Sequence, residues 1–316
     1  MAVYTHPSQK EIDFFIQEYK IGQLVSIEPI INGIDNSNFV LKTSNGTFIL
    51  TIYEKRINKK DIPFFIELLR YIYCNKLPCP LPISRNDGEI YGFISNKPAA
   101  IFSFIKGRSL SNTSVTHCEE VGSILASMHQ KTKGFHLYRK NNLSLPDLKN
   151  LWLICSDKIN ENLKKEIDNE LCFLEESWPK NLPTGIIHAD LFPDNVLFYN
   201  NKIIGLIDFY FSCYDFFMYD LSICINAWCF NENDTYNKSK GFSIVNGYNK
   251  VNSISENELQ SLPILLRGSA LRFFLTRLYD SQNIPFNSIA ITKDPMEYIR
   301  KIRFHKKTSC VSQYGF

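Results

Sequence analysis

Apolar residues in the first part of the chain follow two different spacings. After Ser8 and Glu11, a pair typical of a helix N-terminus, apolar residues recur at helical spacing as far as Tyr19. From residue 23 to residue 53 the pattern becomes that of strands, with an Asn-Gly hairpin signal at 45–46. This pattern predicts a helix followed by a three-stranded antiparallel meander.

The next segments predict one more helix and two more strands. An amphipathic helix is expected at 61–76, with Asp61 as its cap and a proline in its first turn. Strands are expected at 89–95 and 99–105, where the apolar runs are short. Together with the meander they would make a five-stranded antiparallel sheet.

From residue 115 onward the composition is mainly helical. Two helices are expected within 140–180 and three more near 235–250, 256–280 and 294–306. We therefore expect an α+β fold with two lobes, residues 1–106 and residues 107–316.

The stretch from 185 to 211 places three polar side chains at the ends of short apolar runs. Asp190, Asn195 and Asp208 stand there in the order H-x-D-x-x-x-x-N and then I-D-F. Their oxygen atoms are of the kind that Mg²⁺ prefers. The spacing matches the phosphoryl-transfer pattern of kinases, with Asp190 as the base and Asn195 and Asp208 as metal ligands. The alternative, three turn residues with no shared role, is disfavoured by the ordered spacing.

Two neighbouring residues are expected to support this loop without reacting. His188 should fix the loop by hydrogen bonds, and Asp220 should hold it by accepting from backbone N–H groups. Asp215, by contrast, is a candidate to contact a substrate cation. Surface or capping roles are expected for the dispersed histidines, which show no metal spacing: His117, His129 and His136.

The turn between the first two strands is the expected place of the nucleotide phosphates. Kinases cover the phosphates with a glycine-rich turn, but Gly33 is the glycine present here. Asn36, Ser37 and Asn38 would then supply flexibility and donors; the alternative is an ordinary hairpin loop. The candidates to hydrogen-bond and stack the adenine, otherwise ordinary strand residues, are Ser103 and Phe104.

The third strand lacks the lysine with which kinases bind the phosphates. Thr51 stands at the equivalent point and cannot supply that charge. Lys42, or Lys55 and Arg56, are possible substitutes. The phosphate-binding cation is left unassigned.

Composition and charge indicate a soluble protein of ordinary make-up. A net charge of +3 is too small to indicate a nucleic-acid or membrane partner. The nine cysteines lack zinc spacing and are expected to be reduced thiols. The N-terminus lacks the pattern of a signal peptide, and no stretch is apolar for the roughly 18 residues of a membrane span. We expect a cytoplasmic location.

Several segments resemble one known family. HADLFPDNVLF, LIDFYF, DLSICINAW and RGSALRFFLTRLYD are similar to segments of the bacterial homoserine kinases, which have the aminoglycoside-phosphotransferase fold. The resemblance covers nearly the whole chain and implies a protein-kinase-like fold. It implies phosphorylation of L-homoserine by ATP with Mg²⁺, on the route to threonine. It also assigns Asp190 as the base and Asn195 and Asp208 as metal ligands.

Homoserine is a zwitterion, so its pocket needs groups of both charges. The candidates for its carboxylate are three arginines in an otherwise apolar helix, Arg267, Arg272 and Arg277, with Arg272 favoured. Such an arginine can instead form a structural ion pair, for example with Asp280. Asp215 is the choice for the ammonium group.

Two other functions are compatible with the same motifs. A choline- or aminoglycoside-type kinase would bind a cationic alcohol, but residues 256–316 carry more basic than acidic side chains. A nucleotide-binding scaffold without activity predicts damaged base or metal residues, and all three are intact. The sequence predicts ATP and a small-molecule acceptor as ligands and leaves the oligomeric state undetermined.

Overall fold

The sheet of the N-terminal part has the predicted five strands, in the order β1-β2-β3-β5-β4, all antiparallel. The computed structural model describes residues 4–30, 36–54, 57–283, 293–308 and 310–316. The elements of this part are α1 (Gln9–Gln17), β1 (Leu24–Ile30), β2 (Asn36–Thr43), β3 (Gly46–Tyr53), α2 (Ile62–Cys74), β4 (Gly92–Ile94) and β5 (Lys97–Ser103). The predicted strand at 89–95 is shorter than expected, because it pairs with β5 at three positions.

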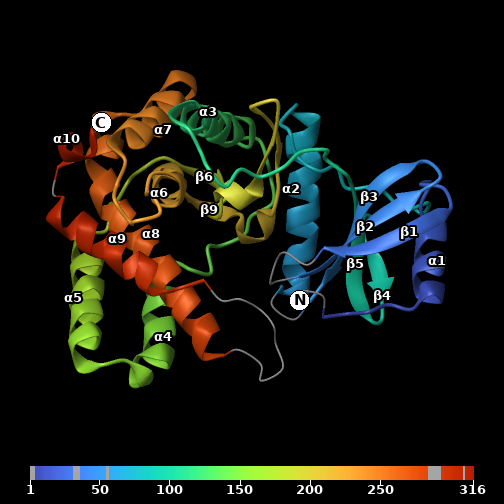
Figure 1. Cartoon of the computed structure of the whole chain (residues 1–316), viewed down its shortest axis with the longest axis horizontal. Helices are drawn as coiled ribbons and strands as arrows, with labels where there is room; N and C mark the ends of the chain where they lie inside the picture. The colour runs from blue at the N-terminus through green and yellow to red at the C-terminus, as the bar shows by residue number, and fades with distance from the viewer. Residues whose placement is uncertain (1–3, 31–35, 55–56, 284–292, 309) are drawn as a thin grey trace.

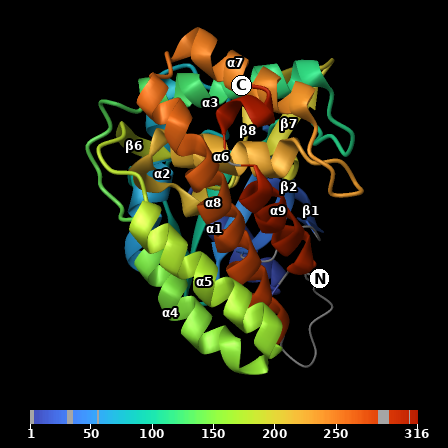
Figure 2. The same ribbon diagram turned by 90° about the vertical axis from the view of Figure 1, so that its left-hand side faces the viewer.

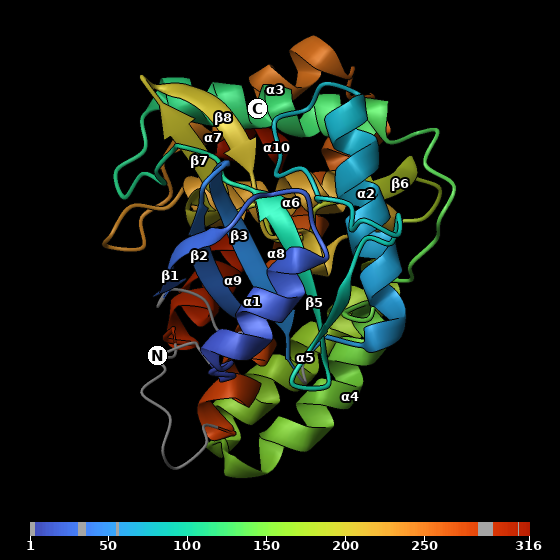
Figure 3. The ribbon, with the colours of Figure 1, turned by 90° about the vertical axis from the view of Figure 1, so that its right-hand side faces the viewer.

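The two faces of this sheet belong to two different hydrophobic cores. Successive side chains of a strand point to opposite faces. Ile101 of β5 therefore packs with α1, while its neighbour Phe102 joins a larger core that includes α2. Figure 3 shows α1 lying across one face of the sheet, with α2 to its side. In Figure 1, α2 stands between the sheet and the helical part of the molecule.

The remaining chain is mainly helical and carries two small two-stranded sheets, β6–β9 and β7–β8. Its elements are α3 (Val115–Lys131), α4 (Leu145–Cys155), α5 (Glu161–Ser177), β6 (Thr184–Ile187), β7 (Val196–Tyr199), β8 (Lys202–Leu206), β9 (Cys213–Phe216), α6 (Phe217–Trp228), α7 (Lys238–Val251), α8 (Glu256–Gln282), α9 (Met296–Lys307) and α10 (Val311–Tyr314). The predicted helices of this part are confirmed. Figure 2 shows α4 and α5 side by side, with α8 and α9 packed next to them.

The chain passes from the sheet to the helices through residues 104–114. Arg108 in this connector exchanges backbone hydrogen bonds with Phe198 of β7. Gly107 lies so close to Leu197 and Ile204 of the β7–β8 hairpin that a Cβ atom would collide with them. The division into lobes at residue 107, which falls inside this connector, stays a prediction.

No helix in the described part of the chain is both long enough and apolar enough to cross a membrane. The longest, α8, has 27 residues, but three arginines interrupt it. Each of them lies against a partner inside the helical part, as described below.

Candidate active site

Asp220 in the first turn of α6 holds the loop that follows β6. Its carboxylate accepts hydrogen bonds from the backbone N–H groups of His188, at 2.7 Å, and Ala189, at 2.8 Å. Ala189 has a φ of 65°, a left-handed conformation that is uncommon for a residue with a side chain. The two bonds stabilise this turn, so the supporting role predicted for Asp220 is confirmed.

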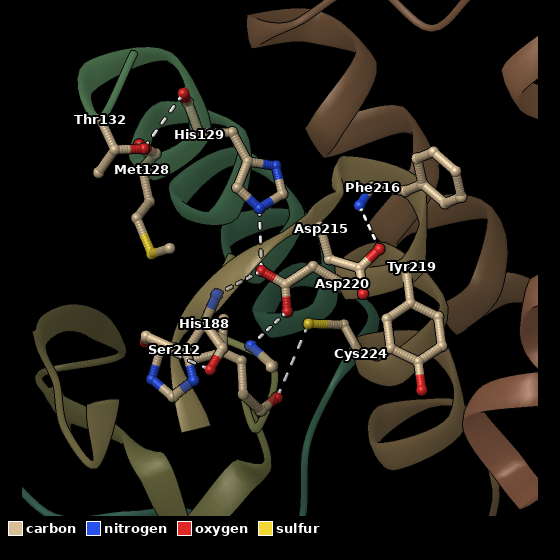
Figure 4. A network of polar contacts seen from close by, with 12 residues as sticks. Met128, His129, Thr132, His188, Ser212, Asp215, Phe216, Tyr219, Asp220 and Cys224 are labelled. Atoms are coloured by element: carbon tan, nitrogen blue, oxygen red, sulfur yellow. Dashed lines mark hydrogen bonds and ion pairs between the residues drawn. The ribbon is translucent and has the colours of Figure 1, made fainter. Parts of the chain in front are cut away.

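A histidine from α3 completes this support (Figure 4). The Nε2 atom of His129 lies 2.9 Å from the Asp220 carboxylate. Its Nδ1 atom lies 2.8 Å from the Tyr248 hydroxyl, which the figure does not label. Burial alone would raise the pKa of Asp220, but the bonds from His129 and from the His188 backbone lower it below its usual value. Asp220 is therefore held as a carboxylate inside the protein.

The surface or capping role expected for His129 is wrong, because the residue is fully buried. Its place on the helix offered a signal, since it lies four residues after Leu125 on the apolar face of α3. His117, in contrast, does cap α3, by accepting from the backbone N–H of Ser114.

The structure brings Asp190, Asn195 and Asp208 together. The amide nitrogen of Asn195 donates to the Asp190 backbone carbonyl, at 2.7 Å, and to its carboxylate, at 3.1 Å. The Ile207 N–H donates to the Asn195 carbonyl, which places Asp208 beside this loop. His188 joins the same two segments: its Nε2 atom lies 3.1 Å from the Ile207 carbonyl, and its Nδ1 accepts from the Asp190 N–H. The predicted loop-fixing role of His188 is confirmed.

The electrostatics of this cluster suit a cation. Burial raises the pKa of Asp190 well above its usual value, and the nearby Asp208 carboxylate raises it further, while Arg272 opposes both. Asn195 uses its amide nitrogen for Asp190, so the amide oxygen is the atom that it can offer to a metal.

The protein atoms in this cluster fit Mg²⁺ only if other ligands complete the shell. Within the described residues, no group of three or more His, Cys, Asp and Glu side chains could hold a metal. Mg²⁺ sites of phosphotransferases are commonly of this kind, with one or two carboxylates and the rest from phosphates and water. The set of Asn195 and Asp208 fits that description.

A cavity of about 390 Å³ is lined by Tyr210 and Phe211, which follow Asp208, and by Arg272, which contacts the loop. Arg272 of α8 lies in its wall and is 2% exposed. One guanidinium nitrogen of Arg272 donates to the Ala189 carbonyl at 2.6 Å, next to Asp190. Its Nε atom has no hydrogen-bond partner among the described residues. Arg272 therefore presents a buried positive charge at the border between the cavity and the loop.

The other two arginines of α8 form structural ion pairs. Arg267 binds the buried Glu170 with two bonds of 2.7 Å, and Arg277 binds Glu297 at 2.6 Å. The alternative of a structural pair is thus the correct one for both, although the carboxylate partners are not the Asp280 suggested by the sequence.

Asp215 lies on β9 and is held by two donors. Its Oδ2 accepts from Asn141 at 2.6 Å and its Oδ1 from the Phe216 N–H at 2.7 Å. Burial raises its pKa. Asn141 lines the cavity, and Asp215 lies behind it. Its role toward a substrate stays a prediction.

The residues predicted to bind the nucleotide lie in strands instead of turns. Asn36, Ser37 and Asn38 begin β2, which corrects the longer turn expected from the sequence. The reason is their side chains: Asn36 accepts from the Glu54 N–H, Ser37 donates to the Glu54 carboxylate at 2.6 Å, and Asn38 accepts from Thr51 at 2.7 Å. Their contact with the phosphates stays a prediction.

The sequence did not point to a further cation of this part, Lys97, whose side chain is 33% exposed. Lys97 of β5 pairs with Glu54 at the end of β3. Lys42 instead pairs with Glu28 on the exposed surface. Three other residues named from the sequence lie outside the described residues: Gly33, Lys55 and Arg56.

The adenine candidates lie where β5 ends. The Ser103 hydroxyl accepts from the Leu81 N–H at 2.8 Å, and the Ser103 N–H donates to the Leu81 carbonyl. Phe104, the next residue, is 42% exposed and so has room for a stacking partner. Both assignments stay predictions.

Comparison with known proteins shows the family of this chain. Residues 26–245 match the model of the phosphotransferase enzyme family. A homoserine kinase of Sinorhizobium medicae is 48% identical over 318 aligned residues, which cover 100% of this chain and 98% of that protein. A homoserine kinase of Brucella canis is 46% identical over the same shares of the two chains.

A solved structure supports the fold. The amicoumacin kinase in complex with AMP-PNP and Ca²⁺ superimposes with a TM-score of 0.72, covering 96% of this chain and 93% of that one. The sequence identity of 15% limits this likeness to the fold. The predicted protein-kinase-like fold is confirmed.

Proposed function

The chain belongs to the homoserine kinases of the phosphotransferase enzyme family, and from this premise we propose that it transfers the γ-phosphoryl group of ATP to the side-chain hydroxyl of L-homoserine. The product is O-phospho-L-homoserine, on the route to threonine. The observation that carries the proposal is the meeting of Asp190, Asn195 and Asp208 next to Arg272, which also lines the cavity.

Asp190 is the base in this proposal. Its carboxylate orients the acceptor hydroxyl and accepts its proton as the hydroxyl attacks the phosphoryl group. The Asn195 amide holds that carboxylate in place at 3.1 Å. Asp220, through the His188 and Ala189 N–H groups, fixes the loop that carries it.

Asn195 and Asp208 are the proposed ligands of Mg²⁺. The bound ion would neutralise charge on the phosphate oxygens of ATP during transfer. Both residues are positioned by the Asn195–Ile207 backbone bond, which joins the end of β8 to the catalytic loop.

Arg272 is the proposed partner of the homoserine carboxylate. Only two methylene groups separate the α-carbon of homoserine from its hydroxyl, so the carboxylate must bind close to Asp190. Arg272 meets this requirement, because it contacts the residue before Asp190 and lines the cavity. A cationic alcohol such as choline would gain nothing from a buried arginine at this place.

We place the reaction in the cytoplasm. All nine cysteines are free thiols, as expected for a reducing compartment.

An ADP-release assay with Mg²⁺-ATP and L-homoserine, choline, an aminoglycoside or L-threonine tests the proposal. Turnover is expected with homoserine, and Asp190→Asn should lower kcat by about a hundredfold or more, since the base is lost. The matched control is Asp194→Asn, four residues away, whose carboxylate pairs with Lys293 at the surface. Turnover with another alcohol alone would contradict the substrate, and equal losses in both variants would contradict the base.

A further inference from the structure

Asp61 and Arg139 form an ion pair that joins the two parts of the molecule at the wall of the cavity. The Nε atom of Arg139 donates to the Asp61 carboxylate at 2.7 Å, across 78 positions of sequence. Both side chains line the same cavity as Arg272 and are mostly buried, at 15% and 20% exposure for Arg139 and Asp61.

The pair is connected to the catalytic loop through Ser212. Arg139 also donates to the Ser212 carbonyl at 3.0 Å, and its guanidinium group lies 4.9 Å from the Phe65 ring. The Ser212 hydroxyl donates to the His188 carbonyl, two residues before Asp190. Three successive contacts, the last of them 3.4 Å long, therefore connect Asp61 to the segment that carries the base.

Asp61 does not cap α2 with its side chain, although it stands at the N-cap position. It occupies the N-cap of α2, where an aspartate commonly accepts from a backbone N–H group, but its side chain makes no such bond. The capping role predicted from the sequence is wrong. The carboxylate turns to Arg139 instead, and the described contact occupies only its Oδ2 atom. An ionised carboxylate can accept several hydrogen bonds at once, so Oδ1 can serve a ligand.

We infer that Asp61 binds the α-ammonium group of the acceptor, with Arg139 as the positioning residue that orients it. The inference rests on the proposed function and extends it to the specificity of the site. With the substrate carboxylate on Arg272, the charges alternate from Arg139 through Asp61, the ammonium and the carboxylate to Arg272. Each charge then has a neighbour of opposite sign, as buried charges require.

Asp215 and Asp280, the two other carboxylates considered, are less suitable partners for the ammonium group. Asp215 is not among the residues that line the cavity, and both of its oxygen atoms already accept a hydrogen bond, whereas the described contact of Asp61 uses one oxygen. Asp280 is on α8, eight residues beyond Arg272, which is about 12 Å along a helix. That distance is too long for a substrate whose α-carbon lies two methylene groups from the reacting hydroxyl.

Acceptors that differ only in their charged groups test the inference. L-homoserine carries both groups, 4-hydroxybutyrate lacks the ammonium, and 3-amino-1-propanol lacks the carboxylate. Asp61→Asn should raise the KM for L-homoserine by about tenfold or more, because a charge-assisted bond is lost, and leave the KM for ATP within twofold. The KM for 3-amino-1-propanol should also rise about tenfold or more, because this acceptor keeps the ammonium. The KM for 4-hydroxybutyrate, which lacks it, should stay within twofold of the wild-type value. For an acceptor too slow to assay, the competitive inhibition constant against L-homoserine replaces the KM.

Two further variants separate recognition from stability. Arg139→Lys keeps the charge but loses the planar fork, so it should raise the KM for the two amines and not for 4-hydroxybutyrate. Glu166→Gln is the matched control, because it breaks a similar ion pair, with Arg303, far from the cavity; all KM values should stay unchanged.

If Asp61→Asn raised the KM by the same factor for all three acceptors, the ion pair would be merely structural and the inference would be overturned. An unchanged KM for homoserine would do the same. A wild-type enzyme that does not phosphorylate homoserine would instead overturn the proposed function.

Discussion

At the scale of single residues, burial can shift the pKa of a side chain so far that the free energy of unfolding depends on pH. His305 of α9 is 1% exposed, with Nδ1 at 2.9 Å from the Tyr314 hydroxyl and Nε2 at 2.8 Å from the Asn226 side chain. Burial, with the charges of Lys301 and Arg267, lowers its pKa from 6.5 to about 3. The folded protein therefore keeps this imidazole neutral where the unfolded chain would protonate it.

This shift predicts a loss of stability in acid. Between pH 6.5 and pH 3 the unfolded state binds a proton that the folded state does not, so the free energy of unfolding falls as the pH falls. From pH 7 to pH 5 the contribution of His305 is about 2 kcal/mol. Urea unfolding at the two pH values should show His305→Gln losing less stability than the wild type by that amount. The exposed His136→Gln serves as the control, and an equal pH dependence in His305→Gln would contradict the prediction.

At the scale of elements, close helix packing positions the support of the active site. α3 and α7 meet at two glycines: a Cβ atom on Gly122 would overlap the Ile244 carbonyl oxygen, and one on Gly247 the Glu119 carbonyl oxygen. This contact places His129 of α3 and Tyr248 of α7 within hydrogen-bond distance of each other. The glycines are thus needed for the network that holds Asp220.

Gly247→Ala should destabilise the protein although alanine is the better helix former. Helix propensity favours alanine by about 1 kcal/mol, but backbone atoms cannot turn aside as a side chain can, and overpacking costs about 1–3 kcal/mol. We expect a net loss of about 1 kcal/mol or more in the free energy of unfolding, measured in urea. Thr116→Ala, on the exposed face of α3, should change stability by less than about 0.5 kcal/mol. A Gly247→Ala variant as stable as the wild type would refute the packing argument.

At the scale of the whole molecule, the boundary between the two hydrophobic cores does not coincide with the boundary between the N-terminal part and the helical part of the chain. α2 belongs by sequence to the N-terminal part, yet Phe65 and Leu69 lie in the larger core, together with residues of the helical part such as Leu191. The Asp61–Arg139 ion pair crosses the same boundary. An interface that is large and apolar couples the stability of the parts that it joins.

Native-state hydrogen exchange should therefore show one cooperative unit. The slowest amides of β3 and of α8 should open with the same free energy, equal to that of global unfolding. Independent lobes would instead give β3 a value lower by about 2 kcal/mol or more. Phe65→Ala, which removes a core side chain of α2, should lower both values together.

Local signals were enough to predict much of the fold and the close approach of Asp190 and Asn195, whose proposed roles in the reaction stay predictions. The hairpin, the start of α1 and the spacing of Asp190, Asn195 and Asp208 all depend on residues near one another in sequence. The order H-x-D-x-x-x-x-N was informative because a short loop between two strands cannot separate its ends widely. Expectations failed where a side chain took a distant partner, as Asp61 and Ser37 did.

The sequence by itself thus determined most of the helices and strands and the family, and it proposed the catalytic motif. The tertiary structure alone decided which partner each charged side chain meets: His129 with Asp220, 91 positions away, and Arg272, but not Arg267, at the cavity. The reason is physical. Periodicity tells which face of a helix is buried, but only the packing of the folded chain tells what that face meets.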